Sequence, residues 1–480
     1  MRKRLMPMAA LVGAIATMPL APAHGAPAGA AAGPAAGPAA ALLDDLSERT
    51  FRFFWETANP VNGLVPDRYP SPSFSSIAAV GFGLTAYPIG IERGYITRAQ
   101  ARERVLATLR FFRNAPQGKQ AQGMSGYKGF FYHFLDMKTG VRSSNSELST
   151  VDTALLIAGV LHMQSYFDGP GEEEMEIRRL ADELYERVDW QWAQARPPAI
   201  VLGWHPETGM LPYDWRGYNE AMLVYVLALA SPTHPVDPKA WDEWTSTYDR
   251  TWGTSWGQEH LGFASHFGHQ YSHVWIDFRG IQDAYMRKRG IDYFENSRRA
   301  TYAQQAYAVA NPLGCKGYGA NLWGVTASDG PADATITDGG KRRKFRSYAG
   351  RGMGKEHYDD CTIAPTGAAA SIAFAPEIAI PAMTDMHARY GKQIYGKYGF
   401  LDAFNPSFDF GIKLANGRRV PGFGWIDTDY LGIDQGPILA MIANHRDESV
   451  WRVMRGNPVI RTGLRRAGFS GGWLENGAKP

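Results

Sequence analysis

Helical periodicity constrains the fold of this chain more than any other feature of its sequence. From Ala41 onward, apolar residues recur at spacings of three and four, beginning with the stretch from Leu42 to Trp55. This spacing is typical of helices with one buried face. We expect further helices over residues 76–94, 98–114, 149–167, 171–195, 219–231, 236–252, 268–289, 291–310, 366–380, 382–396 and 435–447. So much helix, well beyond the usual third of a soluble domain, predicts an all-α fold.

The connections between these helices alternate between short and long. The long ones, such as residues 203–218 and 314–365, are rich in Gly, Trp, Tyr and Asp, and long structured loops usually carry function. No repeat of fixed period is visible, which disfavours a solenoid, and strand-like runs such as residues 130–134 are few. The pattern favours an (α/α) toroid whose long loops crowd one end, with a multi-domain helical array as the alternative.

The first 41 residues differ in composition from the rest. Arg2, Lys3 and Arg4 precede a short apolar stretch from Met6 to Leu20, and small residues follow it. This order is typical of a Sec-type signal peptide, and the apolar stretch is too short to span a membrane. We therefore expect a cleaved signal over residues 1–25, a flexible Ala/Pro/Gly-rich tether over 26–41 and a folded domain over 42–475. A periplasmic or secreted protein without a membrane anchor is expected.

Charge and residue usage narrow the range of partners. The 50 basic and 47 acidic residues leave a net charge of +3, too weak a field to recruit nucleic acid or an anionic membrane. The chain has 14 Trp, 23 Tyr and 23 Phe, whose rings could stack on sugars or simply fill an aromatic core. Cys315 and Cys361 could pair in an oxidising compartment, but their separation in sequence does not say how far apart they lie.

Carboxylates at the mouth of an apolar helix form the first candidate site. Hydrolysis of a glycosidic bond needs one carboxylic acid and a second carboxylate, and Glu147 and Asp152 precede the apolar stretch 153–156. Ser149 and Asp152 also have the spacing of a helix capping box, so Asp152 could be a structural cap. Glu147 lies outside that box and is freer to contact a substrate.

Two further carboxylates stand before apolar helices. Glu220 follows the aromatic loop 204–218 and is expected to open a helix. Apolar neighbours would raise its pKa and the helix N-terminus would lower it. Asp434 precedes Gly436 and Pro437, where we expect a helix to begin, so Asp434 would be held ionised, as a general base requires, or would serve as an N-cap.

The sequence also offers candidate binding loops and a histidine-rich run. Residues 321–330 and 356–366 combine aromatic rings with short polar side chains, which is typical of substrate-binding loops. His266, His269 and His273 would share one face of a helix, so a metal site is conceivable. No HExxH or CxxC pattern and no phosphate-binding glycine loop is present, and we expect no metal.

Six segments together resemble the glucoamylase-like domain family, and within it glycoside hydrolase family 144, the endo-β-1,2-glucanases. They occur in the expected order over residues 41–460. The matching segments are 146–152 (SELSTVD), 218–220 (YNE), 269–279 (HQYSHVWIDFR), 322–330 (LWGVTASDG), 363–366 (IAPT) and 432–437 (GIDQGP).

The resemblance implies an (α/α)6 barrel that hydrolyses linear β-1,2-glucan with inversion, releases sophoro-oligosaccharides and needs no metal or organic cofactor. It makes Glu220 the candidate acid and Asp434 the candidate base, with Glu147 and Asp152 binding substrate or water. Cys361 stands where a small residue such as Gly is expected. We also expect a monomer. Candidate substrate-binding residues are Trp204, Tyr218, His273, Asp277, Arg279, Trp323, Thr326, Asp329, Asp360 and Trp425.

Two other functions are compatible with the residues alone. A polysaccharide lyase on a helical toroid would act on uronates, so its groove should be strongly basic. A non-catalytic periplasmic glycan-binding protein would keep the aromatic platforms but would need no pair of carboxylates across them.

Overall fold

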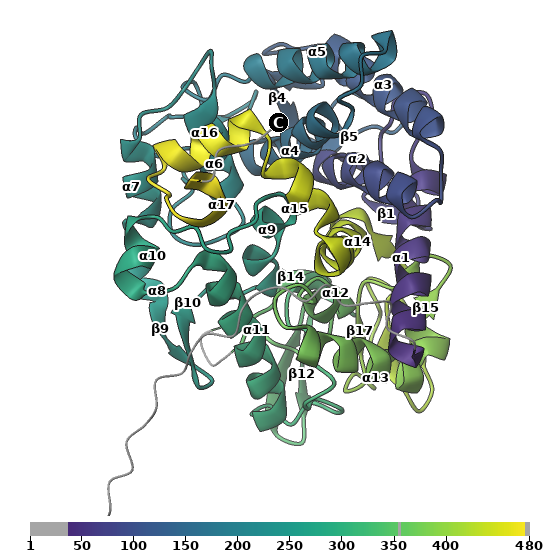
Figure 1. Ribbon diagram of the computed structural model, residues 1–480. Coiled ribbons are helices and arrows are strands. Elements are labelled where there is room, and N and C mark those ends of the chain that lie inside the picture. The colour runs from purple at the N-terminus through teal and green to yellow at the C-terminus, as the bar shows by residue number, and fades with distance from the viewer. Residues whose placement is uncertain (1–36, 354–356, 476–480) are drawn as a thin grey trace, which may run out of the picture. The chain divides into compact units, whose positions relative to one another are not determined.

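The computed structural model describes residues 37–353 and 357–475 (Figure 1). All of them belong to one unit, Ala35–Pro480. The predicted signal peptide and residues 26–36 of the predicted tether lie outside the described residues. The first helix, α1, begins at Pro38, so the last residues assigned to the tether are helical.

Six helices are buried on nearly all sides, and they alternate along the chain with amphipathic helices. In Figure 1, α9, α12 and α14 lie inside the ring of labels formed by α1, α3, α5, α7, α11 and α13. The buried helices are α2 (Ile77–Glu92), α4 (Thr150–Tyr166), α6 (Met222–Ala230), α9 (Tyr271–Trp275), α12 (Pro365–Ala369) and α14 (Gly432–Asp447). The amphipathic ones are α1 (Pro38–Thr57), α3 (Arg98–Asn114), α5 (Glu172–Glu186), α7 (Lys239–Thr245), α11 (Tyr293–Ala310) and α13 (Pro376–Ile394).

Glycines allow two of the buried helices, α2 and α4, to cross at backbone contact. A Cβ atom on Gly81 would lie 2.2 Å from the carbonyl oxygen of Leu155, and one on Gly159 would lie 2.3 Å from the carbonyl oxygen of Gly81. Both helices are apolar around their whole circumference, which is the composition of a helix buried in the core. The sequence therefore explains both the burial of these helices and their close approach.

Shorter helices complete the helical part, and several predicted helices are divided differently from expectation. The predicted helix 236–252 forms α7 and α8. Residues 268–289 form α9 and α10 with an irregular stretch between them, in which Asp277 accepts the backbone N–H of Arg279. The boundary predicted between residues 366–380 and 382–396 lies at residues 370–375 instead, and Pro381 lies inside α13. The shorter helices are α8 (Tyr248–Thr251), η1 (His266–His269), α10 (Ala284–Arg289), α15 (Ser449–Met454), α16 (Pro458–Arg466) and α17 (Gly472–Glu475).

Strands are more numerous than the sequence indicated, so the fold is mainly helical rather than purely α. The described residues contain 20 strands of two to five residues, all in antiparallel pairs. The largest sheet has the order β3 (Gly126–Tyr127), β4 (Phe130–Tyr132), β6 (Leu148–Ser149), β7 (Gly203–His205), β8 (Gly209–Met210). A three-stranded sheet has the order β17 (Phe404–Asn405), β19 (Gly424–Ile426), β18 (Arg418–Val420).

The remaining strands form two-stranded ribbons between the helices. These ribbons are β1 (Arg68–Tyr69) with β20 (Tyr430–Leu431), β2 (Ser75–Ser76) with β5 (Phe134–Leu135), β9 (Trp252–Ser255) with β10 (Gln258–Leu261), β11 (Ala327–Asp329) with β14 (Tyr348–Gly350), β12 (Ala334–Asp338) with β13 (Lys341–Phe345), and β15 (Tyr395–Gly396) with β16 (Gly399–Phe400). In the described part of the chain, no helix has both the length and the apolar character needed to cross a membrane.

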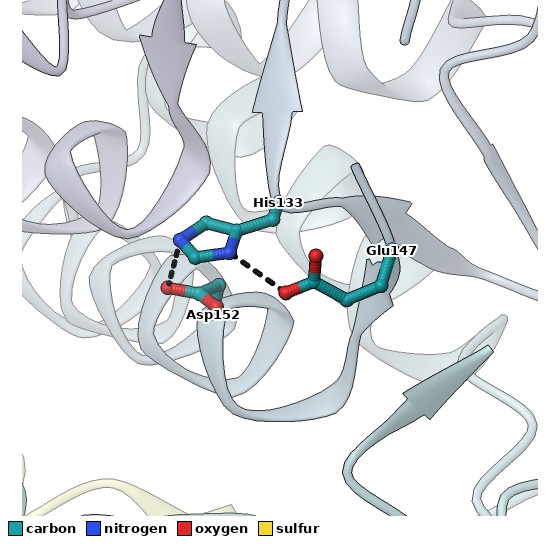
Figure 2. A group of neighbouring side chains, drawn as sticks. All are labelled: His133, Glu147 and Asp152. Atoms are coloured by element: carbon teal, nitrogen blue, oxygen red, sulfur yellow. Dashed lines mark hydrogen bonds and ion pairs between the residues drawn. The ribbon is translucent and has the colours of Figure 1, made fainter. Parts of the chain in front are cut away.

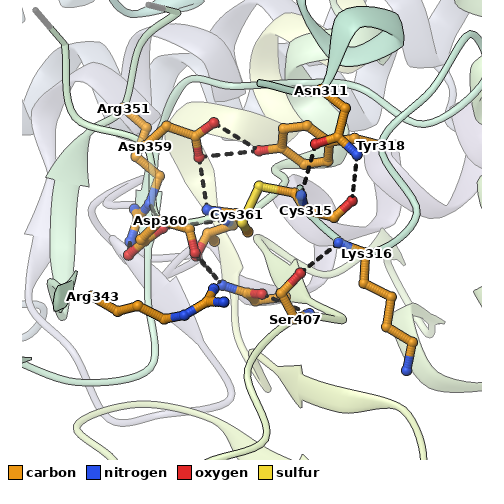
Figure 3. Close-up of a disulfide and its surroundings, with 12 residues drawn as sticks. Asn311, Cys315, Lys316, Tyr318, Arg343, Arg351, Asp359, Asp360, Cys361 and Ser407 are labelled. Carbon is orange, nitrogen blue, oxygen red and sulfur yellow. Dashed lines mark hydrogen bonds and ion pairs between the residues drawn. A yellow bond between two sulfur atoms is a disulfide. The ribbon is translucent and has the colours of Figure 1, made fainter. Parts of the chain in front are cut away.

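A disulfide joins Cys315, which follows α11, to Cys361, which precedes α12 (Figure 3). Their Cα atoms lie 5.3 Å apart. Beside the bridge, the guanidinium of Arg351 and the carboxylate of Asp360 form a buried ion pair, with Nε and Oδ1 2.8 Å apart. The pairing that the sequence left open is therefore made, and it joins the two ends of the long connection between α11 and α12.

Candidate active site

A cavity of about 330 Å³ opens where the N-terminal ends of several buried helices meet. Its volume is within the range of small-molecule sites. Ser76 caps α2, Asp152 is in the first turn of α4, Tyr271 begins α9 and Ile433 is in the first turn of α14. The full lining is Asp67, Arg68, Phe74, Ser76, Ala78, His133, Phe134, Val151, Asp152, Leu155, Glu220, Phe267, Tyr271, Ala327, Tyr348, Leu431 and Ile433.

Glu220 lies in the cavity wall with one carboxyl oxygen free. It occupies a turn just before α6, whose first residue is Met222, rather than opening the helix as predicted. Its Oε2 is buried and has no hydrogen-bond partner among the described residues. Burial raises the pKa of Glu220 to about 7, and the negative charge of Asp152 adds to the effect. Desolvation therefore outweighs the helix N-terminus, and this carboxyl can carry a proton near neutral pH.

Asp434 is the third residue of α14, because the helix begins at Gly432 and not at Gly436 or Pro437 as predicted. Its side chain caps nothing, since the N-cap Leu431 precedes it by three residues. Burial raises the pKa of Asp434 to about 7, opposed by a hydrogen bond with Asp402. The expectation that the helix N-terminus alone keeps Asp434 ionised is therefore wrong: its pKa depends on how deeply it is buried.

Three more aspartates gather beside Asp434. Carboxylate oxygens of Asp329, Asp402 and Asp427 lie within 4.8 Å of one another, close enough to share protons or a cation. Burial raises the pKa of Asp427 to about 9 and that of Asp402 well above its usual range. Arg68, in the cavity wall, donates to Asp329 with Nη1 and Oδ2 2.6 Å apart. The cluster thus joins the cavity wall to Asp434 through buried carboxyl groups whose pKa values are raised by burial.

His133 connects the two acidic residues of the first candidate segment (Figure 2). It lies between β4 and β5, with Nδ1 2.8 Å from Oε1 of Glu147 and Nε2 3.6 Å from Oδ1 of Asp152. Burial by itself would lower the pKa of His133, but the two carboxylates outweigh it and raise this pKa to about 9. The ring is therefore an imidazolium at neutral pH, and Glu147 and Asp152 are held beside the cavity as its counter-ions.

Ser149 is the cap of α4, and Asp152 takes part in that cap only as its partner. The Ser149 hydroxyl accepts the N–H of Asp152 at 3.2 Å, which caps α4, and donates to Oδ2 of Asp152 at 2.5 Å. The other carboxyl oxygen of Asp152 faces His133. The helix cap therefore orients the carboxylate toward the cavity.

Two of the predicted substrate-binding residues, Asp329 and Thr326, bind residues of the cavity wall without lining the cavity themselves. Asp329 pairs with Arg68, and Oγ1 of Thr326 accepts the N–H of Phe267 at 3.0 Å. Trp204 packs on Tyr127, with ring centroids 5.3 Å apart, in the sheet that contains Glu147's neighbour Leu148.

The other predicted binding residues lie in the interior or in ion pairs outside the cavity lining. Tyr218 shares a hydrogen bond with Ser297, and so does His273. Trp323 and Trp425 are fully buried. The remaining positions belong to ion pairs: Asp277 with Arg279 and Arg455, and Asp360 with Arg351. Their binding roles stay predictions that this geometry does not favour.

The histidine-rich run belongs to the core. His266 is buried against Ser371, with Nε2 and Oγ 3.0 Å apart, and burial lowers the pKa of His266 to about 3. His273 is buried in the same way, with its pKa lowered to about 3. In the described part of the chain, the side chains grouped closely enough to hold a metal are His133, Glu147 and Asp152, and Asp329, Asp402 and Asp427.

Several residues of the cavity were not found by sequence reasoning. His133 is the single basic residue in the aromatic run 130–134, and Arg68 follows Asp67 in a connection without a recognised motif. Tyr271 was visible within the predicted segment 269–279, and its hydroxyl donates to the carbonyl of Ile433 at 3.1 Å. The polarity of His133 within an apolar run was the signal that could have identified it.

Comparison with known proteins agrees with this architecture. The family model "Glycoamylase: Putative glucoamylase" matches residues 212–458, just over half of the chain. A putative glucoamylase of Bacteroides uniformis is 31% identical in sequence, with a TM-score of 0.78, over 90% of this chain and 98% of that one. The endo-β-1,2-glucanase of Chitinophaga pinensis, solved with sophorotriose and glucose, is 27% identical, with a TM-score of 0.78, over 91% of this chain and 100% of that one.

A curated relative is also similar. The exo-β-1,2-glucooligosaccharide sophorohydrolase (non-reducing end) of Parabacteroides distasonis is 27% identical over 462 residues, which is 88% of this chain. The alignment spans 57% of the length of that relative. On the family match and the whole-length structural similarity together, this chain belongs to the glucoamylase-like domain family.

Proposed function

We propose that the chain is a glycoside hydrolase that cleaves β-1,2-glucan and releases sophoro-oligosaccharides. The observation that carries the proposal is Glu220, whose buried and unpartnered Oε2 lies in the cavity wall and whose pKa is raised to about 7. A carboxyl group that keeps its proton near neutral pH can protonate the leaving oxygen of a glycosidic bond. The two relatives named for β-1,2-linked substrates support the choice of linkage.

The second carboxyl group of the mechanism is assigned to Asp434. In an inverting reaction the base takes a proton from water while the acid protonates the leaving group, and the two carboxyl groups stand about 6.5–9.5 Å apart. The charges of Asp434 and Glu220 both raise the pKa of Tyr271, which places this ring within electrostatic reach of each. Tyr271 and Ile433 line the cavity together with Glu220, and Asp434 follows Ile433 without being part of the lining. In the proposed reaction, water held near Tyr271 would give its proton to Asp434 and attack the sugar.

The fold proposed for this reaction is an (α/α)6 toroid. The alternation of six buried and six amphipathic helices supports it, as does the position of the cavity at the N-terminal ends of buried helices. In such a barrel the long connections gather at one end and form the substrate cleft. Residues 203–218 and 314–365 would then be the loops of that cleft.

The charges of the cavity wall favour a hydrolase over a lyase. Asp67 and Asp152 balance Arg68 and His133, while Glu220 is the proposed protonated acid. The groove of a lyase, which binds uronates, should instead be strongly basic. A neutral glucan would instead find hydroxyl-binding acceptors and aromatic rings.

We also propose that the protein acts as a monomer in the periplasm or outside the cell. The basic and apolar residues 1–20 support export. The disulfide between Cys315 and Cys361 supports an oxidising compartment, since structural disulfides are rare in the cytosol. Sedimentation of the purified protein would test the monomer, and cell fractionation would test the location.

The decisive experiment compares Glu220→Gln with the unchanged protein on linear β-1,2-glucan. New reducing ends should appear with the unchanged protein, and Glu220→Gln should lower kcat by about 10² to 10⁴, the usual contribution of a general acid. Glu103→Gln, on the exposed face of α3, is the matched control and should keep full activity. Digestion of β-1,3-, β-1,4- and α-1,4-glucans in parallel tests the linkage preference. The configuration of the anomer that is released first tests whether the reaction proceeds with inversion. Full activity of Glu220→Gln would exclude Glu220 as the acid.

A further inference from the structure

We propose that His133 is a positioning residue for the acid Glu220: as an imidazolium between Glu147 and Asp152, it neutralises the carboxylate of Asp152, which lines the same cavity as Glu220. It thereby sets how readily Glu220 releases its proton. The inference deepens the proposed function and rests on it, because it assigns a role to a neighbour of the proposed acid.

Both ring nitrogens of His133 are directed at carboxylates (Figure 2). Nδ1 lies at hydrogen-bond distance from Glu147, 2.8 Å, and Nε2 lies 3.6 Å from Asp152. The second distance is too long for a hydrogen bond and is that of an ion pair. A neutral imidazole has one N–H and one lone pair, so it would turn a lone pair toward one of the two anions. Only the doubly protonated ring satisfies both sides.

The same geometry argues against a metal held by these three residues. A bound cation would need the ring to direct one nitrogen at it together with both carboxylates. Here the two nitrogens, on opposite edges of the ring, face different carboxylates (Figure 2). The ring itself therefore occupies the place between the carboxylates that a metal would need.

The position of the imidazolium is fixed by the backbone and by stacking. The N–H of His133 donates to the carbonyl of Glu147 at 2.9 Å, and its carbonyl accepts the N–H of Ile77 at 3.2 Å. The ring stacks on Phe134, with centroids 3.9 Å apart. The charge is therefore held at one place in the wall, beside the first turn of α4.

Asp152 carries the effect from His133 to Glu220. Both carboxyl groups line the same cavity, and the charge of Asp152 makes it harder for Glu220 to ionise. The imidazolium of His133 opposes that charge. Without it, the negative field on Glu220 would increase and the acid would hold its proton more tightly.

Other charged groups also face these residues and have to be considered. Asp67 acts on His133 from the connection before β1, and His205 acts on Glu147 from β7. Arg68 lies in the same cavity wall but is engaged by Asp329. Arg68 bridges Asp67 and Asp329, whereas His133 bridges Glu147 and Asp152. A change at His133 therefore has a distinct effect on Asp152.

The first test measures the pKa of Glu220 by carbon-13 NMR of labelled glutamate carboxyl groups. The signal that is missing in Glu220→Gln is the one that belongs to Glu220. In His133→Gln, this pKa should rise by about 0.5 unit or more, where one unit is a tenfold change in proton affinity. The basic limb of kcat/KM against pH should move upward by the same amount. Adding Asp152→Asn to His133→Gln should lower this pKa again, because the negative charge that His133 opposes is then gone. His234→Gln, in an exposed connection, is the control and should leave the pKa unchanged.

The second test needs neither activity nor a folded variant. Nitrogen-15 NMR of histidine-labelled protein should show one ring with both nitrogens protonated up to about pH 8, since the pKa of His133 is raised to about 9. A single-tautomer neutral ring at pH 7 would overturn the inference, as would an unchanged Glu220 pKa in His133→Gln. If Glu220→Gln stays fully active while His133 titrates as described, the proposed acid fails and the charge state of His133 stands.

Discussion

Removal of the disulfide should give a large loss of stability whose size can be worked out from this structure. The bridge from Cys315 to Cys361 closes a loop with a sequence separation of 46. In the chain-entropy description, closing a loop of this length removes about 13 cal/mol/K from the unfolded ensemble, or about 4 kcal/mol at 25 °C. Cys315→Ala/Cys361→Ala should therefore lower the free energy of unfolding by about 4 kcal/mol.

The conformation of Cys361 provides a matched comparison. Its φ is +70°, in the left-handed region that costs a residue with a Cβ about 1 kcal/mol. Replacing Cys361 with Gly instead of Ala removes that cost. Cys315→Ala/Cys361→Gly should therefore be about 1 kcal/mol more stable than Cys315→Ala/Cys361→Ala.

Urea unfolding, followed by tryptophan fluorescence with and without reductant, measures both differences. Reductant should destabilise the unchanged protein to the level of the double variant and should leave the variants unaffected. If Cys315→Ala/Cys361→Ala unfolds at the midpoint and slope of the unchanged protein, the loop-entropy argument is refuted. The buried pair of Arg351 and Asp360 would then be sufficient to hold this connection in place.

Three further predictions concern packing, buried charge and pH. Gly81→Ala should cost about 1–3 kcal/mol, because its Cβ would lie 2.2 Å from the α4 backbone, whereas Gly171→Ala, in open space, should change stability by less than about 0.5 kcal/mol in the same urea titration. Arg351→Met should cost about 3–5 kcal/mol by leaving Asp360 buried without its cation, and adding Asp360→Asn should recover part of the loss; equal stabilities of the two variants would contradict this. The proposed acid and the proposed base both have a pKa raised to about 7. Because the acid works only below its pKa and the base only above its own, kcat/KM should have a narrow maximum near pH 7. A flat profile of kcat/KM between pH 5 and 9 would contradict the assignment.

Much of this protein could be predicted from the order of its residues. The apolar spacing predicted α3 over residues 98–114 at its observed bounds, and the alternation of helices with long connections predicted a mainly helical domain. The ordered motifs predicted the family. These are local patterns, and a helix or a motif depends on residues close in sequence.

Only the tertiary structure decided which of the candidate site residues lie close together. Tyr218, Trp323 and Trp425 have the composition of a sugar-binding surface, and all three are buried in the interior. His133 carried no motif, yet the pairing of β4 with β6 places it between two carboxylates that lie 14 and 19 positions away in sequence.

The pKa of the proposed acid shows why the sequence alone could not decide the site. In the sequence, the aromatic residues before Glu220 would raise its pKa and the helix N-terminus would lower it, and the balance depends on how deeply the carboxyl group is buried. The structure sets that depth: Oε2 is buried, the helix begins two residues later, and desolvation prevails. Burial is a sum over residues from the whole chain, so it exists only once the chain has folded.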